Sequence, residues 1–252
     1  MEKFMVGGCV RDEILGIKSK DIDFSVVLSA DEIPDPTLTI AVIDPYDVMV
    51  NNLIDEGVTI IRGNDGVPIG AEFLTVRGID PKMGAVDFVL ARKESDYSDG
   101  RRPDRVEIGT LEDDLRRRDF TVNALAKDAE GNIIDLFGGV QDINERVLRA
   151  VGSASERLSE DALRAVRALR FSVTKGFRID HELEFAMQTV AVLDAIENKI
   201  SDERIKDELS KMFKFDTVAS IVALNKFPAL TRAVFSGSVS LDATMKTKGR
   251  GK

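Results

Sequence analysis

Two glycines and two aspartates near the start of the chain constrain how its N-terminal part can fold. Residues 4–6 predict a short strand, Gly7-Gly8 a tight turn, and residues 10–15 a helix. A second strand is expected at Asp21-Ile22-Asp23. Because successive side chains of a strand point to opposite faces, Asp21 and Asp23 would share one face. The sequence therefore predicts a strand–turn–helix–strand unit that carries a pair of carboxylates.

This carboxylate pair and the glycine turn together favour a site for Mg²⁺ and phosphate. Two carboxylates about 5 Å apart repel by about 3 kcal/mol at an effective dielectric near 20. Mg²⁺ takes one or two carboxylates and leaves its other positions to water and phosphate. The N–H groups of a turn such as Gly7-Gly8 can cradle a phosphate. Taken singly, each motif is more often a plain turn or a solvated strand face.

Composition narrows the class of protein. The chain has 252 residues, of which 43% are hydrophobic and 31% charged, which is typical of one large or two small globular domains. No apolar run reaches the ~20 residues of a membrane span, and no signal-peptide pattern is present. A single Cys9 and a single His181 exclude internal disulfides and a Cys/His zinc site, and they favour a cytoplasmic location. The net charge of −9 argues against a general nucleic-acid coat but allows a local basic groove.

The chain divides into a mixed α/β part and a helical part. Residues 30–80 predict mixed strands with a helix near residues 47–56, and residues 85–91 alternate as a strand. Residues 93–105 are rich in charge, Ser and Gly, and they predict a mobile loop. Beyond about residue 142 no further strand is expected.

Capping signals and periodicity predict the helices that follow. Ser159 is expected to cap a helix over residues 160–175. Residues 181–196 and 202–213 also have helical periodicity. The last dozen residues are expected to be disordered.

Asp87 lies in the middle of the predicted strand 85–91, on a face of small residues. A third carboxylate beside the first two would complete an acidic cluster able to hold two Mg²⁺ ions, which clamp the attacking and leaving oxygens in nucleotidyl transfer. The alternative is an edge-strand aspartate that faces water.

A basic run at Arg117-Arg118 directly precedes Asp119 and Asn123. Arginine makes planar, bidentate contacts to phosphate, and Asp or Asn can hold ribose hydroxyls. The alternative is a solvated helix end.

On the predicted helix over residues 160–175, Asp161 and Arg164 would lie on one face, and Arg167 and Arg170 would continue it. One interpretation is a ladder of ion pairs within the helix. The other is that Asp161 and Arg164 present an acceptor and donors to the edge of a base, so that protein rather than template selects the nucleotide.

Seven motifs occur in order along residues 4–213. They are Val6-Gly7-Gly8-Cys9-Val10-Arg11-Asp12 with Leu15-Gly16, Lys20-Asp21-Ile22-Asp23-Phe24, Arg101-Arg102-Pro103, the segment 114–126, Asp135-Leu136-Phe137-Gly138-Gly139 with Asp142, the segment 160–171 and the segment 200–209. In these motifs the chain resembles the class II tRNA nucleotidyltransferases (CCA-adding enzymes) and the related bacterial poly(A) polymerases.

The resemblance implies an α+β fold: a nucleotidyltransferase (polymerase beta-like) head with a mixed β-sheet, followed by an all-helical neck. The head would span residues 1–140, and the neck, which recognises the nucleotide base, residues 141–214. Residues 215–252 would be a short helical remnant of the body with a disordered basic tail. The chain is expected to be a short form that lacks most of the body and tail.

The resemblance also implies the residues of the site. The catalytic carboxylates would be Asp21, Asp23 and, by a looser match, Asp87; Asp21 and Asp23 would hold the metal, expected to be two Mg²⁺ ions. The implied nucleotide-binding residues are Gly7, Gly8 and Arg11 at the triphosphate, Arg118, Asp119 and Asn123 around the ribose and triphosphate, and Asp161 and Arg164 at the base, with Arg167 supporting them.

The implied activity is template-independent addition of CMP and AMP from CTP and ATP to the 3′ end of tRNA, releasing pyrophosphate. Alternatives are a poly(A) or oligo(A) polymerase, an enzyme that adds only C or only A, and a non-catalytic RNA- or nucleotide-binding protein. The expected partners are the 3′ end of tRNA or another RNA, ATP and CTP, and no membrane. A homodimer or a helper protein could replace the missing tail. The candidate dimer surface includes Phe213, Phe215, Phe227 and Phe235, although single aromatic residues more often belong to the core.

Overall fold

The structure, a computed structural model, describes residues 1–19, 21–29, 31–33, 44–95 and 105–237. These residues form two units. Unit 1 consists of Met1–Glu94, Arg105–Arg118 and Val122–Val140. Unit 2 contains Asp119–Thr121 and the residues from Gln141 onward. The predicted disordered tail and the motif Arg101-Arg102-Pro103 lie outside the described residues.

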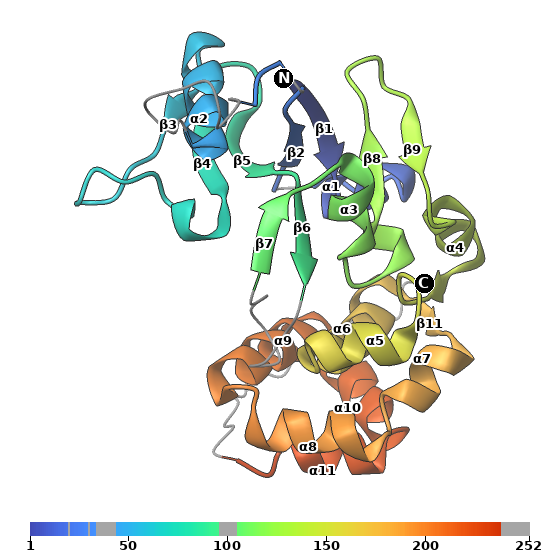
Figure 1. Cartoon of the computed structure of the whole chain (residues 1–252). Coiled ribbons are helices and arrows are strands. Elements are labelled where there is room, and N and C mark those ends of the chain that lie inside the picture. Colours follow the sequence, from blue (N-terminus) through green and yellow to red (C-terminus); the bar gives the residue numbers. More distant parts are fainter. Residues whose placement is uncertain (20, 30, 34–43, 96–104, 238–252) are drawn as a thin grey trace. The chain divides into compact units, whose positions relative to one another are not determined.

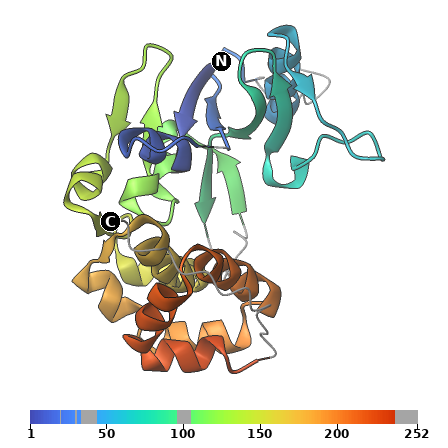
Figure 2. The same ribbon diagram turned by 180° about the vertical axis from the view of Figure 1, so that it is seen from behind.

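Unit 1 is built on a seven-stranded sheet with the order β3-β4-β5-β2-β1-β8-β9, seen from two sides in Figure 1 and Figure 2. Its strands are β1 (Glu2–Val6), β2 (Asp23–Val27), β3 (Thr59–Ile60), β4 (Thr75–Asp80), β5 (Gly84–Leu90), β8 (Leu125–Lys127) and β9 (Ile133–Asp135). Strand β2 pairs antiparallel with β1 and parallel with β5, so the sheet is mixed, as predicted.

The N-terminal strand–turn–helix–strand unit is present. After β1, Gly7 leads into α1 (Gly8–Ile14). Strand β2 begins at Asp23, so Asp21 precedes the strand rather than lying on it, which corrects the predicted strand start. The pairing of β1 with β2 extends only as far as Phe24, and the carbonyl of Ile22 accepts the N–H of Asp87 at 3.0 Å.

The helix predicted near residues 47–56 is α2 (Pro45–Asp55). Asp44 caps it by accepting the N–H of Tyr46 at 2.9 Å, and Pro45 occupies its first turn. Its buried side chains pack with those of the sheet in one core: Val26, Tyr46, Met49, Val50, Leu53, Val76, Val86, Phe88 and Leu90. Each such burial contributes about 1.5–3 kcal/mol, so this core holds β2 and β5 in register.

The predicted loop over residues 93–105 is wrong at both ends. Strands β6 (Arg92–Ser95) and β7 (Arg105–Ile108) form a two-stranded sheet of their own. At its base, Gly109 donates its N–H to the carbonyl of Ala91 at 2.9 Å. Backbone pairing therefore extends the chain here although its composition is loop-like; residues 96–104 lie outside the described residues. The connection returns to unit 1 through α3 (Leu111–Arg116).

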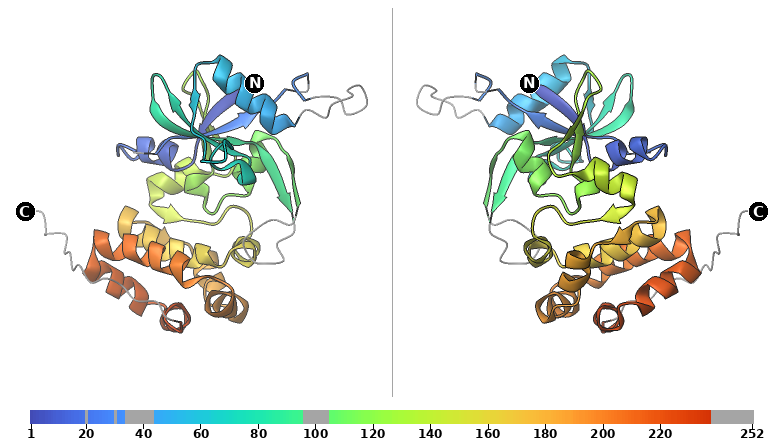
Figure 3. Two further views of the ribbon diagram at one scale, coloured as in Figure 1. Left: turned by 90° about the vertical axis from the view of Figure 1, so that its left-hand side faces the viewer. Right: turned by 90° about the vertical axis from the view of Figure 1, so that its right-hand side faces the viewer.

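Unit 2 is mainly helical (Figure 3). Its helices are α4 (Gly139–Glu145, which begins in the last residues of unit 1), α5 (Ala154–Glu160), α6 (Leu163–Lys175), α7 (His181–Ala186), α8 (Val190–Asn198), α9 (Asp202–Phe215), α10 (Thr217–Asn225) and α11 (Pro228–Val234). The expectation of no strand beyond residue 142 is wrong, because β10 (Val147–Leu148) and β11 (Arg178–Ile179) pair in parallel.

The helix predicted over residues 160–175 is also wrong at its start. Ser153, not Ser159, caps α5 by accepting the N–H of Glu156 at 3.4 Å. The chain then breaks at Asp161, whose backbone is extended (φ −150°, ψ 100°), before α6 begins. Ser159 lies inside α5, where its hydroxyl donates to the carbonyl of Glu156.

Helices α6 and α9 pack against each other within unit 2. The apolar side chains they bury are Leu163, Val166, Leu169 and Phe171 of α6 and Ile205, Leu209 and Met212 of α9. Helix α9 confirms the helix predicted over residues 202–213. The polar side chains between the two helices belong to the candidate site.

The remaining surface predictions have mixed outcomes. Phe227 is buried at 4% exposure, whereas Phe235 is exposed at 39%, so the four phenylalanines do not form one exposed set. The homodimer stays a prediction. Within the described residues, no helix combines the length and the apolar character needed to cross a membrane.

Candidate active site

The turn between β1 and α1 closes around Arg118. Gly7 has φ +79°, a conformation that residues with side chains rarely adopt. A Cβ atom at position 7 would lie 2.6 Å from Nη1 of Arg118, and one at Gly8 would lie 3.4 Å from Nη2 of Arg11. The two glycines therefore let two guanidinium groups lie directly against the backbone of the turn.

Arg118 is held in place by Asp114 of α3. The Asp114 carboxylate is fully buried and accepts Nη2 of Arg118 at 2.9 Å and Nε of Arg117 at 3.0 Å. Burial alone would raise the pKa of Asp114, but Arg118 and Arg117 outweigh it and lower that pKa to about 2. The buried Nε of Arg118 has no hydrogen-bond partner among the described residues, which leaves it a donor for an anion.

Arg11 and Asn123, both predicted nucleotide-binding residues, contact each other. Nη1 of Arg11 donates to Oδ1 of Asn123, and its Nε donates to Oδ1 of Asp12 at 2.8 Å. All three side chains are buried. The structure thus brings together Arg11 and Asn123, which stand 112 positions apart in the sequence.

The carboxylate of Asp23 is affected by two like charges, those of Asp21 and Asp87. Asp23 and Asp87 are register partners on the parallel strands β2 and β5. Burial raises the pKa of Asp23, and the negative charges of Asp87 and Asp21 raise it further, while Arg118 and Arg77 act in the opposite direction. Asp23 is therefore a partly buried carboxylate with two like charges near it.

Asp87 is not an edge-strand residue, because β5 lies between β4 and β2. Arg77 of β4, its partner across the strands, holds the Asp87 carboxylate through two hydrogen bonds of 2.8 Å. Among the described residues, no three acidic, histidine or cysteine side chains are arranged to hold a metal ion. The three-carboxylate cluster around two ions stays a prediction, and in this structure its third member, Asp87, is paired with Arg77.

The donor set of Asp21 and Asp23 nevertheless fits a divalent cation. Both groups offer carboxylate oxygens, the ligands that Mg²⁺ prefers. The repulsion that raises the pKa of Asp23 would be relieved by a cation beside it. The fit rests on ligand type and charge.

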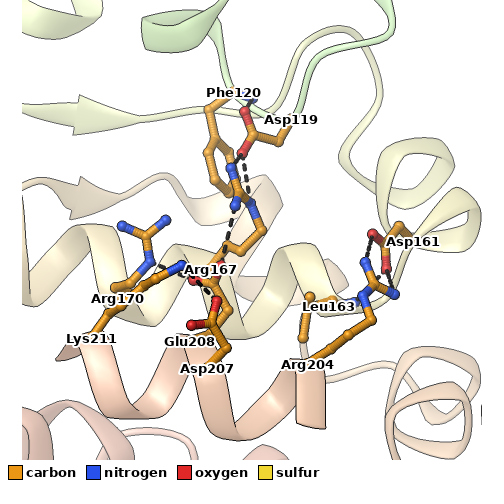
Figure 4. Close-up of polar contacts among 10 residues, drawn as sticks. All are labelled: Asp119, Phe120, Asp161, Leu163, Arg167, Arg170, Arg204, Asp207, Glu208 and Lys211. Carbon is orange, nitrogen blue, oxygen red and sulfur yellow. Dashed lines mark hydrogen bonds and ion pairs between the residues drawn. The ribbon is translucent and has the colours of Figure 1, made fainter. Parts of the chain in front are cut away.

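In unit 2, the buried carboxylates of Asp119 and Glu208 form an ion network with the half-buried Arg167 (Figure 4). Oδ2 of Asp119 accepts Nε and Nη2 of Arg167 at 2.9 and 2.6 Å, and Nη1 of Arg167 donates to Oε1 of Glu208 at 3.2 Å. Nε of Arg170 donates to the other oxygen of Glu208. Burial alone would lower the pKa of Arg167, but the carboxylates of Asp119 and Glu208 raise it above its ordinary value.

Asp161 and Arg164 do not share a helix face as predicted, because Asp161 lies in the break between α5 and α6. Arg204 of α9 donates Nη2 to Oδ2 of Asp161 at 2.6 Å and Nη1 to Oδ1 at 3.3 Å. Arg164 instead donates to Glu160 at 2.7 Å and to the carbonyl of Arg157 at 2.9 Å. The interpretation as a ladder within one helix is therefore wrong for Asp161, whose partner comes from another helix.

Four residues that hold the predicted site residues were assigned no role from the sequence: Arg77, Asp114, Arg204 and Glu208. Asp114 precedes Arg117 by three residues and Arg118 by four, and this helical spacing is a sequence signal that predicts ion pairs between them. Arg77 needs the register of β4 on β5, and Arg204 and Glu208 need the packing of α9 on α6. No local pattern contains that information.

Comparison with known proteins agrees with the motifs. Residues 3–149 match the family described as "Poly A polymerase head domain". The chain is 42% identical over 214 residues to the CCA-adding enzyme of Lactococcus lactis subsp. cremoris, a match that covers 84% of this chain and 46% of that protein.

Solved structures agree as well. The crystal structure of the Bacillus stearothermophilus CCA-adding enzyme in complex with CTP matches with a TM-score of 0.66 and 30% identity, covering 90% of this chain and 48% of that one. The Thermotoga maritima CCA-adding enzyme, complexed with tRNA, shares the fold with a TM-score of 0.68 at 24% identity, over 96% of this chain and 50% of that one.

The chain thus spans about half the length of the curated relatives it matches. The predicted fold class, a nucleotidyltransferase head with a mixed sheet followed by a helical region, is confirmed, and so is the resemblance drawn from the motifs. The family match covers more than half of the chain, and the chain belongs to the poly A polymerase head domain family.

Proposed function

We propose that this protein is a metal-dependent nucleotidyltransferase that adds CMP and AMP from CTP and ATP to the 3′ end of tRNA. The observation that carries the proposal is the presence of the carboxylates of Asp21 and Asp23 together with a glycine turn against which the Arg118 guanidinium lies. The name of the Lactococcus lactis relative, a CCA-adding enzyme, supports the choice of reaction.

In the proposed reaction, the 3′-hydroxyl oxygen of the RNA attacks the α-phosphorus of the nucleotide in line. A new 3′-O–P bond forms as the hydroxyl proton is released to solvent, the bond from the α-phosphorus to the bridging oxygen breaks, and its electron pair leaves with pyrophosphate. Gly7, Gly8, Arg11 and Arg118 would bind the triphosphate, and Asn123, which contacts Arg11, would act near the ribose. Most of the catalysis would come from positioning and charge neutralisation.

Members of nucleotidyltransferase families generally use a divalent metal ion. We propose Mg²⁺, held by Asp21 and Asp23, where it would neutralise charge on the phosphates. Two ions are expected from the sequence, and the second ion would require the Asp87 carboxylate as a ligand. That group would first have to leave its two hydrogen bonds with Arg77.

In unit 2, Asp161 and Arg164 are the proposed base-recognition residues, with Asp119 and Arg167 as a supporting pair. Cytosine and adenine both present an amino donor beside a ring-nitrogen acceptor on their Watson–Crick edges, whereas guanine and uracil present the reverse. A carboxylate acceptor next to a guanidinium donor therefore matches C and A and rejects G and U.

The proposal also keeps the partners and location predicted from the sequence. They are the 3′ end of tRNA or another RNA, CTP and ATP, and a cytoplasmic location consistent with the single Cys9. A poly(A) or oligo(A) polymerase, a C-only or A-only enzyme, and a non-catalytic binding protein remain the alternatives.

The test is extension of three tRNA transcripts, ending before the first C, after the first C and after CC. Each is incubated with Mg²⁺ and CTP, ATP or both, and an Asp21→Ala variant serves as the control. Addition that stops at CCA and is lost in the variant is the expected result. A long A ladder, or addition of one nucleotide only, would replace CCA addition by the corresponding alternative. Nucleotide binding without any extension would favour the binding-protein alternative.

A further inference from the structure

Unit 2 contains a cavity that takes no part in the proposed reaction. It has a volume of about 260 Å³, and it is lined by residues from the end of α6, from β11 and α7, and from the end of α10. None of the residues proposed for catalysis or nucleotide binding lines it. An apolar cavity of about 150 Å³ can hold a benzene ring, so this space admits a small molecule with one ring.

Part of the cavity wall is apolar. Phe177, Ile179 and Phe227 line it, and they are 2%, 6% and 4% exposed. The rings of Phe177 and Phe227 offer faces and edges against which another ring can pack. An apolar ring of a ligand would be removed from water at this surface, and that removal favours binding.

Charged side chains of both signs line the same cavity. Arg178 and Lys226 are exposed, and Glu184 is half-buried. Among the described residues, neither cation forms an ion pair with Glu184 or with another carboxylate. Oε2 of Glu184 lies 3.6 Å from Nδ1 of His181, whose side chain is 92% exposed, and a contact so open to water contributes little. Within the described part of the chain, two unpaired cations and a weakly paired carboxylate therefore line one cavity.

We infer that this cavity binds a free α-amino acid with an aromatic side chain. The carboxylate of the ligand lies between Arg178 and Lys226, because guanidinium and ammonium groups are the donors that form charge-assisted bonds with carboxylates. The ammonium group of the ligand donates to Glu184, and its ring packs against Phe177 and Phe227.

A zwitterion is the class of ligand that satisfies all three charged groups at once. A carboxylate compound without an ammonium group would be attracted by Arg178 and Lys226 but repelled by Glu184. An amine without a carboxylate would meet the reverse. The phosphate of a nucleotide or an RNA fits less well for the same reason, since it brings no positive charge to Glu184.

The test is calorimetric titration of the full chain with four compounds. L-phenylalanine carries all three groups, 3-phenylpropionate lacks the ammonium group, 2-phenylethylamine lacks the carboxylate, and L-alanine lacks the ring. We expect L-phenylalanine to bind at least about tenfold more tightly than each of the others, since each of them loses a charge-assisted or an apolar contact. Binding of L-phenylalanine no tighter than that of 3-phenylpropionate would overturn the inference. So would the absence of binding by all four compounds at millimolar concentrations.

Two substitutions separate the roles of the charges. Arg178→Gln should weaken the binding of L-phenylalanine at least about tenfold without weakening that of 2-phenylethylamine, which has no carboxylate to lose a partner. Glu184→Gln should weaken L-phenylalanine by a similar factor, yet bind 3-phenylpropionate at least as tightly as the parent chain does, because a repelling charge is gone. A variant that weakened all compounds alike would contradict these roles, because its effect would then be purely structural.

The matched controls are Arg232→Gln and Glu197→Gln, at exposed positions of α11 and α8 that do not line the cavity. Both should keep the parent's affinity for L-phenylalanine, and losses equal to those of the cavity variants would overturn the inference. The readout is binding of an amino acid, so it does not depend on the proposed function. A chain that extends no RNA would refute the proposed function and leave this test unaffected.

Discussion

At the scale of single residues, the backbone conformation of Gly7 and its lack of a side chain allow the guanidinium of Arg118 to lie against the turn. Its φ of +79° would strain the backbone of any residue that has a side chain. A Cβ atom at this position would also collide with the guanidinium of Arg118. Gly16 has a similar φ of +69° but no atom within 4 Å of a Cβ position. A substitution at Gly16 therefore strains the backbone alone, whereas a substitution at Gly7 strains the backbone and also displaces Arg118.

Both Gly7→Ala and Gly16→Ala should lower the free energy of unfolding by about 1–3 kcal/mol, the cost of a strained backbone. Only Gly7→Ala should also raise KM for CTP and ATP, because it displaces Arg118. Urea denaturation and steady-state kinetics check the two effects. Equal KM values in the two variants would show that the position of Arg118 is irrelevant to nucleotide binding.

The charge of Asp23 should destabilise the folded protein when no cation is present. The charges of Asp21 and Asp87 and partial burial all disfavour its ionised form. In the presence of EDTA, we expect Asp23→Asn to melt at or above the temperature of the parent chain. Added Mg²⁺ should stabilise the parent by RT ln(1 + [Mg²⁺]/Kd), about 1.4 kcal/mol at ten times Kd, and leave the variant unchanged. An equal Mg²⁺ response in both proteins would remove Asp23 from the metal site.

Asp114 should give the protein a pH-dependent contribution to stability. Its pKa of about 2 in the folded state lies below the ordinary value of 3.8, so the unfolded chain takes up its proton first as pH falls. This contribution, about 2 kcal/mol, is complete above pH ~5 and is lost as pH falls towards 2. Asp114→Asn should therefore cost at least this much at pH 7, and the gap to the parent should narrow near pH 3. A gap that does not change with pH would contradict the ionic role of Asp114.

At the scale of elements, Glu208 couples α9 to α6. Breaking a buried ion pair by removing one partner's charge costs about 3–5 kcal/mol, because the other charges stay buried. Glu208→Gln should therefore unfold at a much lower urea concentration than the parent. Asp207→Asn, at a neighbouring exposed position of the same helix, should change stability by less than about 0.5 kcal/mol. Similar losses in both variants would contradict the network.

The sequence predicted those elements whose signals are local. The turn at Gly7-Gly8, the helix near residues 47–56 and the alternation of residues 85–91 depend on neighbours along the chain, and all three are present as the turn before α1, α2 and β5. The break at Asp161 was missed because the segment around it favours a helix, and the side chain that holds the break open, Arg204, comes from 43 residues away. Arg77 was missed for the same reason, since only the register of two strands places it on Asp87.

At the scale of the whole molecule, unit 1 draws on residues from well beyond its first hundred. Strand β8 lies beside β1, with Met5 opposite Lys127 and Val6 opposite Ala126. A fragment of residues 1–140 should therefore keep the whole sheet, whereas a fragment of residues 1–118 should not fold. Circular dichroism and amide hydrogen exchange of the two fragments check this. Equal protection in both would show that β8 and β9 are dispensable.

The parallel pairing of β2 with β5 also has a consequence for the newly made chain. Asp23 and Asp87 become neighbours only after the chain that joins them has been synthesised, and the turn at Gly7 is completed by the carbonyl of Leu125. Chains are translated from the N-terminus, so the first half of the head leaves the ribosome with its carboxylates apart and its glycine turn open. The arrangement proposed to bind the nucleotide is therefore complete only after both distant strands have emerged.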